Sequence, residues 1–194
     1  MVKSIGPNKI LTAVFISGTG TNFKNLIKFS FKKRSPINIK LVISSNSKAK
    51  GLNFAKKYKI KKKIYLFKKK GLDEKKILKN LEENKISLIC LAGFMKILSK
   101  KFIKSFKGKI LNIHPSLLPK YKGLNTHKRV IKNKEKYSGC TVHFVSSKLD
   151  SGRIILQKKV KIKRSDNAKS LQKKILKEEY KLYPKALRKL YFNL

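Results

Sequence analysis

The feature that most constrains the fold is a regular alternation of short apolar runs with segments of helical periodicity. Residues 9–17 form a nearly continuous apolar run, whereas residues 22–33 place their apolar side chains three and four positions apart. Strands that are apolar on both faces are typical of parallel sheets covered by helices on both sides. The first strand and helix therefore predict a βα unit of an α/β fold.

The same alternation continues through the first half of the chain and slightly beyond it. We expect further strands at residues 37–44, 63–67, 86–92 and 109–113, and helices at residues 49–58, 73–83 and 98–106. The pattern predicts a mostly parallel central sheet with helices on both faces.

The C-terminal third follows a different pattern. Residues 140–145 and 154–162 are expected strands whose connection is too short for a helix, so they should pair as an antiparallel hairpin. A long helix is expected at residues 167–190, with Pro184 as a point where it would be interrupted. At 194 residues, the chain is most simply one domain.

The chain is very basic, with a formal net charge of +42, which raises nucleic acid as a partner. The arginines that bidentate phosphate and base recognition favours are few: Arg34, Arg129, Arg153, Arg164 and Arg188. The lysines are spread along the chain, as the codon bias of an AT-rich genome would produce. We expect non-specific polyanion binding that salt weakens, and no specific nucleic-acid partner.

Other classes of protein are disfavoured by what the sequence lacks. Its apolar runs are too short to cross a bilayer, and Met1 to Asn8 lack the apolar centre of a signal peptide, so we expect a cytoplasmic protein. Cys90 and Cys140 lie in apolar segments and are expected to be reduced core residues. The cysteines and the three histidines do not have zinc-ligand spacing, so no metal site is expected.

The clearest candidate for chemistry is the end of the expected strand at residues 109–113. Asn112 and His114 are two positions apart, so in an extended chain both side chains point to one face. Pro115 and Pro119 cannot donate ladder hydrogen bonds, so the chain should leave the sheet there. The pair would then lie at a carboxyl strand end, where open α/β sheets bind ligands.

Asp150 is a candidate partner of this pair, because it lies in the connection of the expected hairpin, which can fold over the strand end. A carboxylate beside His114 would orient the imidazole for proton transfer, and the Asn112 amide can donate to an oxyanion. Taken singly, His114 is also compatible with a packed core histidine, and Asp150 before Ser151 with a simple turn former.

The turn at residues 17–22 (SGTGTN) suggests a phosphate site, because glycines allow close backbone approach and a helix N-terminus follows. The motif is weak, since Phe23 stands where a dinucleotide fingerprint has its third glycine, and the P-loop lysine is missing. A tight turn with Thr21 or Asn22 as the helix cap is the alternative.

Four blocks together resemble one family. The blocks are residues 17–22 (SGTGTN), 91–99 (LAGFMKILS), 112–121 (NIHPSLLPKY), and 142–144 (VHF) followed by 149–152 (LDSG). Their order and spacing are similar to those of the phosphoribosylglycinamide formyltransferase family over nearly the whole chain. The resemblance implies a Rossmann-like formyltransferase fold spanning residues 1–194, with a nucleotide-binding half at about 9–110 and a folate-binding and catalytic half at about 86–194.

The resemblance also implies the activity. The family transfers the formyl group of 10-formyltetrahydrofolate, a co-substrate, to the amine of 5'-phosphoribosylglycinamide in de novo purine (IMP) biosynthesis, without a metal. Asn112 would hold the formyl oxygen, His114 would assist proton transfer, and Asp150 would keep His114 charged or relay the proton through water. Partners would be these small molecules, for a monomer or homodimer. The family also implies a cis bond between Leu118 and Pro119.

Binding residues are carried over in the same way. The residues implied for the phosphoribosylglycinamide substrate are Gly18, Gly20, Thr21, Asn22 and Glu179. The residues implied for the folate are Lys70, Met95, Lys96, Ile97, Leu98 and Asn112. The family often has arginine where Lys70 stands, and a lysine lacks the planar fork that pairs with a carboxylate.

Three alternative functions fit part of the sequence but explain less of it than phosphoribosylglycinamide formyl transfer does. A methionyl-tRNA formyltransferase would suit the basic charge but has an additional C-terminal domain, and a formyltetrahydrofolate deformylase has an N-terminal regulatory domain. In this chain residues 9–17 are already the expected first catalytic strand. A non-catalytic basic RNA-binding protein would give no reason for the order of Asn112, His114 and Asp150.

Overall fold

The computed structural model describes residues 9–192. Met1 to Asn8, where no signal peptide was expected, lie outside the described residues. One sheet organises the chain, in the order β3-β2-β1-β4-β5-β6-β7. Its strands are β1 (Ile10–Ile16), β2 (Ile37–Ser44), β3 (Lys61–Ile64), β4 (Leu88–Leu91), β5 (Lys109–His114), β6 (Tyr137–Phe144) and β7 (Ile154–Lys161). Strands β1 to β5 pair in parallel, and β6 is antiparallel to both β5 and β7.

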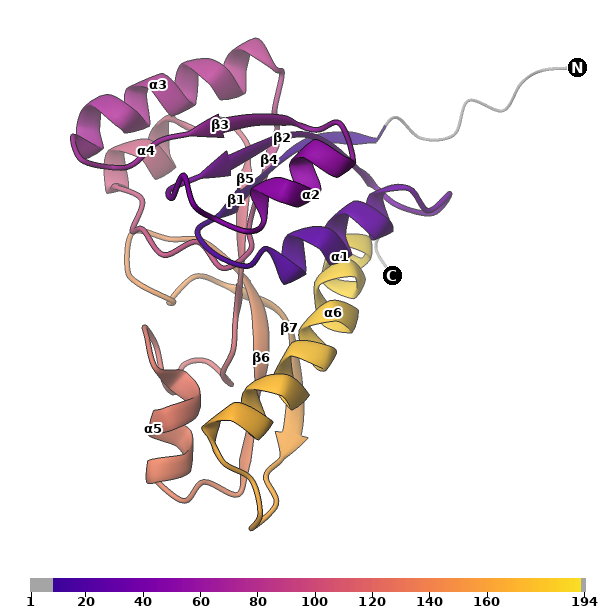
Figure 1. Cartoon of the computed structure of the whole chain (residues 1–194), viewed down its shortest axis with the longest axis vertical. Helices are drawn as coiled ribbons and strands as arrows, with labels where there is room; N and C mark the ends of the chain where they lie inside the picture. Colours follow the sequence, from indigo (N-terminus) through magenta and orange to yellow (C-terminus); the bar gives the residue numbers. More distant parts are fainter. Residues whose placement is uncertain (1–8, 193–194) are drawn as a thin grey trace, which may run out of the picture.

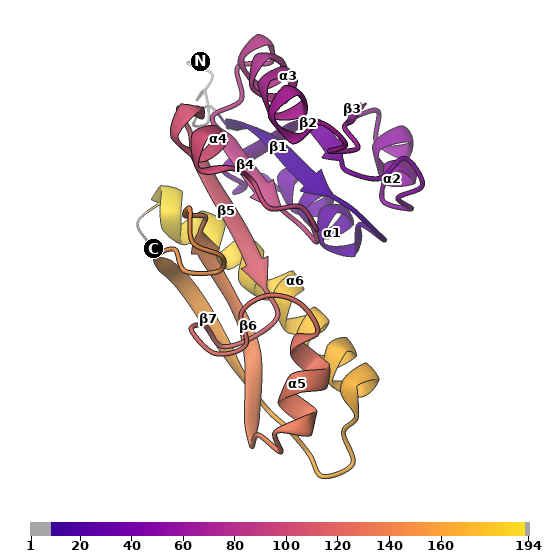
Figure 2. The ribbon, with the colours of Figure 1, turned by 90° about the vertical axis from the view of Figure 1, so that its left-hand side faces the viewer.

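Helices cover both faces of this sheet (Figures 1 and 2). They are α1 (Thr21–Ser30), α2 (Leu52–Lys57), α3 (Lys70–Glu83), α4 (Lys100–Ser105), α5 (Thr126–Lys132) and α6 (Ala168–Phe192). Alternate residues of β1 enter two separate cores: Val14 and Ile16 pack with α1, α2 and α6, whereas Ala13 and Phe15 pack with α3 and α4. The expected α/β architecture, hairpin and long last helix are confirmed.

Some expected boundaries were wrong. Strand β3 ends at Ile64, whereas residues 63–67 were expected, because Tyr65 and Phe67 leave the edge strand to pack against the second core. Helix α5 was not expected at all, since its seven residues carry little periodic signal. Helix α6 continues through Pro184, where buried Tyr183 and Leu187 hold it against the sheet.

The expectations for the two cysteines and for the Leu118–Pro119 bond agree with the structure. Cys90 and Cys140 are both free and buried, and burial raises the pKa of each thiol to about 12. The Leu118–Pro119 peptide bond is cis. Within residues 9–192, no helix is both long and apolar enough to cross a membrane.

Candidate active site

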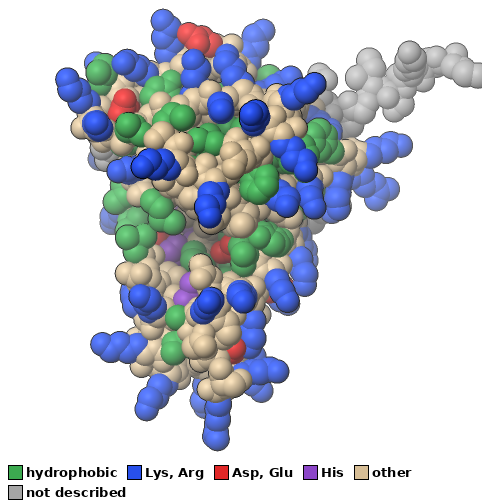
Figure 3. All heavy atoms as spheres, in the orientation of Figure 1, with side chains coloured by type: hydrophobic (Ala, Val, Ile, Leu, Met, Phe, Trp, Pro, Cys, Tyr) green, Lys and Arg blue, Asp and Glu red, His purple; other side chains and the backbone are tan. Residues whose placement is uncertain are grey.

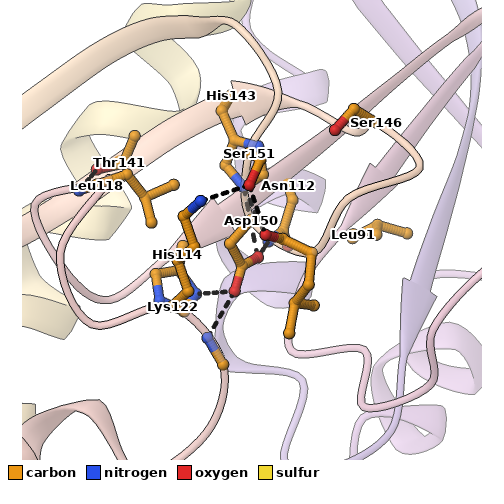
Figure 4. Close-up of polar contacts among 12 residues, drawn as sticks. Leu91, Asn112, His114, Leu118, Lys122, Thr141, His143, Ser146, Asp150 and Ser151 are labelled. Carbon is orange, nitrogen blue, oxygen red and sulfur yellow. Dashed lines mark hydrogen bonds and ion pairs between the residues drawn. The ribbon is translucent and has the colours of Figure 1, made fainter.

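The candidate site forms where β5 ends beside β6. Asn112 and His114 project from one face of β5, and Asn112 lies opposite His143 in the antiparallel register with β6. Figure 4 shows Asn112, His114 and His143 around Asp150, which reaches in from the loop between β6 and β7. The structure therefore brings together the three side chains expected to act in catalysis, and it adds His143.

His114 is almost fully buried, with 6% of its surface exposed. Its Nδ1 lies 3.4 Å from Asp150 Oδ2, and its Nε2 lies 2.8 Å from the backbone carbonyl of Tyr121. A carbonyl oxygen only accepts, so Nε2 must carry a hydrogen in this arrangement. Both ring nitrogens face acceptors, which suits an imidazolium that donates on both sides.

Asp150 is held in place by two neighbouring segments. Its Oδ2 accepts a hydrogen bond of 2.8 Å from the backbone N–H of Gly123, and its Oδ1 lies 3.5 Å from Asn112 Nδ2. Asp150 has a φ of 45°, in the left-handed region that aspartate tolerates better than most residues. Lys122 also reaches the same loop, where its Nζ bonds to Ser151 Oγ (Figure 4).

His143 was not expected as a site residue. Its Nδ1 donates to the carbonyl of Phe144 at 2.8 Å, so Nε2 is left to accept from Asn112 Nδ2 at 3.2 Å. Burial lowers the pKa of His143, against the opposing effects of the Phe144 carbonyl and Asp150. The ring is therefore neutral near pH 7, and its 3.8 Å approach to Asp150 is not an ion pair.

The glycine-rich turn after β1 packs closely on the turn before α2. Gly20 occupies the N-cap of α1 with a φ of 71° and no side-chain cap, so neither Thr21 nor Asn22 caps the helix. A Cβ on Gly20 would lie 2.5 Å from Gly51 Cα, whereas a Cβ on Gly18 would meet no atom within 4 Å. The turn needs Gly20 for its fold, while Gly18 lies beside open space and accepts a hydrogen bond of 3.0 Å from Gly51 through its carbonyl.

Asn22 and Glu179 meet although 157 residues separate them in the chain. Asn22 Nδ2 on α1 donates to Glu179 Oε2 on α6 at 2.7 Å, and both side chains are buried. Burial raises the pKa of Glu179 to about 7, with the Asn22 hydrogen bond as a smaller opposing effect. Asn22 Oδ1 has no hydrogen-bond partner among residues 9–192. The pair thus presents acceptor atoms that protein groups do not saturate.

The residues expected to bind the folate differ in how far their side chains are exposed. Met95 and Ile97, in the segment after β4, expose 64% and 61% of their surfaces, and Lys96 is also exposed. Leu98 is instead buried in the core with α3 and α4, so its side chain does not line a surface. Lys70 begins α3, and its side chain lies outside the described part of the structure.

The surface view shows where these groups open to solvent. Histidine side chains lie in a hollow midway along the molecule, with hydrophobic side chains at its edges and lysines and arginines around it (Figure 3). Among the described residues, no group of three potential metal ligands is found. The hollow therefore places histidine side chains beside hydrophobic surface within a basic surround.

Comparison with known proteins identifies the family. The formyl transferase family matches residues 10–187, which is nearly the whole chain. The chain belongs to the formyl transferase family. Phosphoribosylglycinamide formyltransferase of Haemophilus influenzae is 43% identical over 175 residues, covering 89% of this chain and 82% of that protein. The trifunctional purine biosynthetic protein adenosine-3 of Gallus gallus is 43% identical over 94% of this chain, which spans only 18% of that relative.

Solved structures agree with this placement in the formyl transferase family. Phosphoribosylglycinamide formyltransferase from Anaplasma phagocytophilum has a TM-score of 0.87 and 42% identity, covering 94% of this chain and 87% of that one. The enzyme of the same name from Brucella melitensis has a TM-score of 0.88 and 40% identity, covering 94% and 95%. The expected fold is confirmed by these structures, and the expected formyl transferase family by the family match.

Proposed function

We propose that this formyl transferase moves the formyl group of 10-formyltetrahydrofolate to the amine of 5'-phosphoribosylglycinamide. The products would be formylglycinamide ribonucleotide and tetrahydrofolate, in the purine pathway. The observation that carries the proposal is the cluster of Asn112, His114 and Asp150 at one strand end of a formyl transferase. An amide donor beside a buried histidine and carboxylate suits acyl transfer to an amine without a protein nucleophile.

The reaction begins with attack of the substrate amine on the formyl carbon. A new C–N bond forms, and the formyl oxygen gains negative charge as the carbon becomes tetrahedral. One Nδ2 hydrogen of Asn112 is taken by His143, 3.2 Å away, so the other, which points to Asp150 Oδ1 at 3.5 Å in the free protein, would turn to stabilise that oxygen. Neutral His143 therefore fixes which end of the Asn112 amide faces the reacting carbon.

Proton transfer completes the reaction. The attacking amine loses a proton, and the folate nitrogen must gain one when its bond to the formyl carbon breaks. Asp150 lies between His114 and Asn112, with one oxygen turned toward each side chain. Asp150 accepts the amine proton through water, and protonated His114 gives its proton through water to the departing nitrogen. Transfer of the amine proton from Asp150 Oδ2 to His114 Nδ1, 3.4 Å away, then restores both groups. His114 and Asp150 together keep the proton count balanced.

The nucleotide is proposed to bind between α1 and α6. Its phosphate would lie on the turn of Gly18, Gly20 and Thr21, where free backbone N–H groups begin a helix. Its amine and amide hydrogens would meet the acceptors of Glu179 and Asn22. Hydrogen bonds from these N–H groups would offset part of the cost of ionising the buried Glu179 carboxyl.

The folate is proposed to bind against the segment after β4. Met95 and Ile97 offer exposed apolar surface for the pteridine, and Leu98 contributes through its backbone, since its side chain is buried. Lys70 and Lys96 would attract the negative glutamate tail. This division assigns the nucleotide mainly to residues 9–110 and the folate and catalysis to residues 86–194, with Glu179 and Lys70 as the two exceptions.

The setting of the enzyme is proposed on the same grounds. We expect small-molecule substrates, no metal, a cytoplasmic location and a monomer or homodimer. The charge of +42 should also retain RNA or heparin at low salt without selectivity, and the retention should fall as salt rises.

An assay of the purified protein tests the proposed function. The protein is incubated with 10-formyltetrahydrofolate and 5'-phosphoribosylglycinamide, and the formylated nucleotide is measured by mass spectrometry. Asp150→Ala and His114→Ala should lose most of the turnover, while Glu82→Gln, on the exposed side of α3, should keep it. Absence of product with wild type, or full turnover in both alanine variants, would overturn the proposal.

A further inference from the structure

The backbone of Tyr121 has an unusual conformation at an important place. Its φ is 56°, in the left-handed region that costs a bulky residue free energy and persists only where the surroundings hold it. The carbonyl of this residue accepts the Nε2 hydrogen of His114 at 2.8 Å. The one contact that occupies the ring edge opposite Asp150 therefore depends on a strained loop residue.

The side chain of Tyr121 supplies the restraint. Its hydroxyl donates to Glu135 Oε1 at 2.8 Å and accepts from Asn133 Nδ2 at 3.0 Å. The guanidinium of Arg129 lies 5.4 Å from the ring centroid, within cation–π range. Groups on and just after α5 thus fix the Tyr121 ring from its edge and its face.

Glu135 is the acidic residue among the groups that anchor Tyr121. Hydrogen bonds from Tyr121 and then Lys120 lower the pKa of Glu135, so it is a carboxylate at neutral pH. Hydrogen bonds to a carboxylate are shorter and stronger than neutral ones. The Lys120 side chain is 68% exposed and its ion pair contributes little, so the contact with the Tyr121 hydroxyl is the one that orders the loop.

We propose that Tyr121, anchored by Glu135, is a positioning residue that holds His114 in its working orientation. The Tyr121 carbonyl keeps the hydrogen on Nε2 and aligns the ring so that Nδ1 faces Asp150. The expected effect of Tyr121 on turnover rests on the proposed function. The positioning itself is a property of the free protein.

The neighbouring space explains why the anchor is needed. A cavity of about 240 Å³ lies beside it, and Tyr121, Glu135 and Lys120 are among its lining residues. A Tyr121 ring freed from Glu135 can shift toward this cavity, and the carbonyl would then leave His114. A misplacement of about 1 Å at a catalytic group can lower the rate by roughly 100-fold.

Two near-isosteric variants test the role of the anchor. Tyr121→Phe removes only the hydroxyl, and Glu135→Gln removes only the charge. Lys120→Met is the matched control, because it removes the ion pair with Glu135 but leaves the Tyr121 bond. The first two should lower kcat roughly 10-fold with KM nearly unchanged, while the control stays close to wild type.

Nitrogen NMR of the His114 ring supplies a readout that does not require turnover. At a pH high enough for the His114 ring to be neutral, Nε2 should carry the hydrogen in wild type, and in Tyr121→Phe and Glu135→Gln a second tautomer or ring orientation should become populated. An unchanged His114 spectrum in both variants, or equal changes in Lys120→Met, would overturn the proposal whatever happens to kcat. A wild type without formyl transfer but with these spectral changes would refute the proposed function and keep the positioning role.

Discussion

His143 accepts a hydrogen bond from Asn112 across the β5–β6 pair, with 3.2 Å between Nε2 and Nδ2. The His143 ring cannot reverse this role, because its other nitrogen donates to the carbonyl of Phe144. The lowered pKa of His143 keeps the ring neutral, so Nε2 stays an acceptor. This contact fixes the amide end that Asn112 presents to the proposed formyl group.

Replacing His143 with leucine should therefore impair catalysis by releasing the Asn112 amide. We expect kcat to fall roughly 10-fold, less than the 100-fold or more that removal of the oxyanion donor itself in Asn112→Ala should cost. Steady-state kinetics of both variants measures the difference. A His143→Leu enzyme with wild-type kcat and stability would show that the amide needs no such acceptor.

Asp150→Asn separates charge from shape at the same site. Asparagine can still accept from the N–H of Gly123, but it cannot take a proton or face an imidazolium as a charge. We expect a fall in kcat of roughly 100-fold to 10,000-fold with little change in KM. Loss of substrate binding with kcat retained would instead indicate a purely structural role for Asp150.

The two glycines of the turn after β1 should respond differently to alanine. Gly20→Ala should lower the free energy of unfolding by about 1–3 kcal/mol, because of its positive φ and the contact with Gly51. Gly18→Ala should fold normally, since its Cβ meets no atom within 4 Å, and should raise the KM for the nucleotide alone. Thermal unfolding and kinetics distinguish these effects. An unchanged nucleotide KM in Gly18→Ala would argue against the phosphate site.

Glu179 should make stability depend on pH. Its pKa is raised from a usual value of 4.5 to about 7 in the folded protein, so the folded state binds more protons than the unfolded state between these values. The stability that protonation supplies is full below about pH 4.5 and is lost as the pH rises through about 7.

Glu179→Gln removes this dependence because a glutamine does not ionise. Denaturation of both proteins at about pH 5 and about pH 8 should show the variant gaining on wild type at the higher pH, by on the order of 1–3 kcal/mol. Leu171→Ala, a core variant of the same helix, serves as a control that should lower stability equally at both values. A gap between Glu179→Gln and wild type that does not change with pH would contradict the raised pKa.

Local patterns in the sequence predicted most of the fold. Asn112 and His114 were placed on one face because side chains two positions apart in a strand share a face, which requires no tertiary information. His143 was missed, because its meeting with Asn112 depends on the register of two antiparallel strands. Asn22 and Glu179 lie too far apart in the chain for any spacing rule, and only the family resemblance implied that both serve one substrate.

Backbone contributions were beyond the reach of side-chain patterns. The Tyr121 carbonyl that accepts from His114 has no sequence signal, because every residue carries a carbonyl. Helix α5, which follows Asn125 in its left-handed backbone conformation, was likewise not predicted because it is short. The buried Leu98 shows the converse limit, since a motif match does not reveal which side chains point inward.

An isotope competition shows whether the enzyme transfers the formyl group to the nucleotide amine. The enzyme receives 10-formyltetrahydrofolate with a ¹³C-labelled formyl group, together with 5'-phosphoribosylglycinamide and methionyl-tRNA, and mass spectrometry locates the label. We expect the label to enter formylglycinamide ribonucleotide and the Asp150→Asn substitution to nearly abolish this transfer. Label found mainly in formate or in methionyl-tRNA, or a full transfer by the Asp150→Asn enzyme, would contradict this expectation.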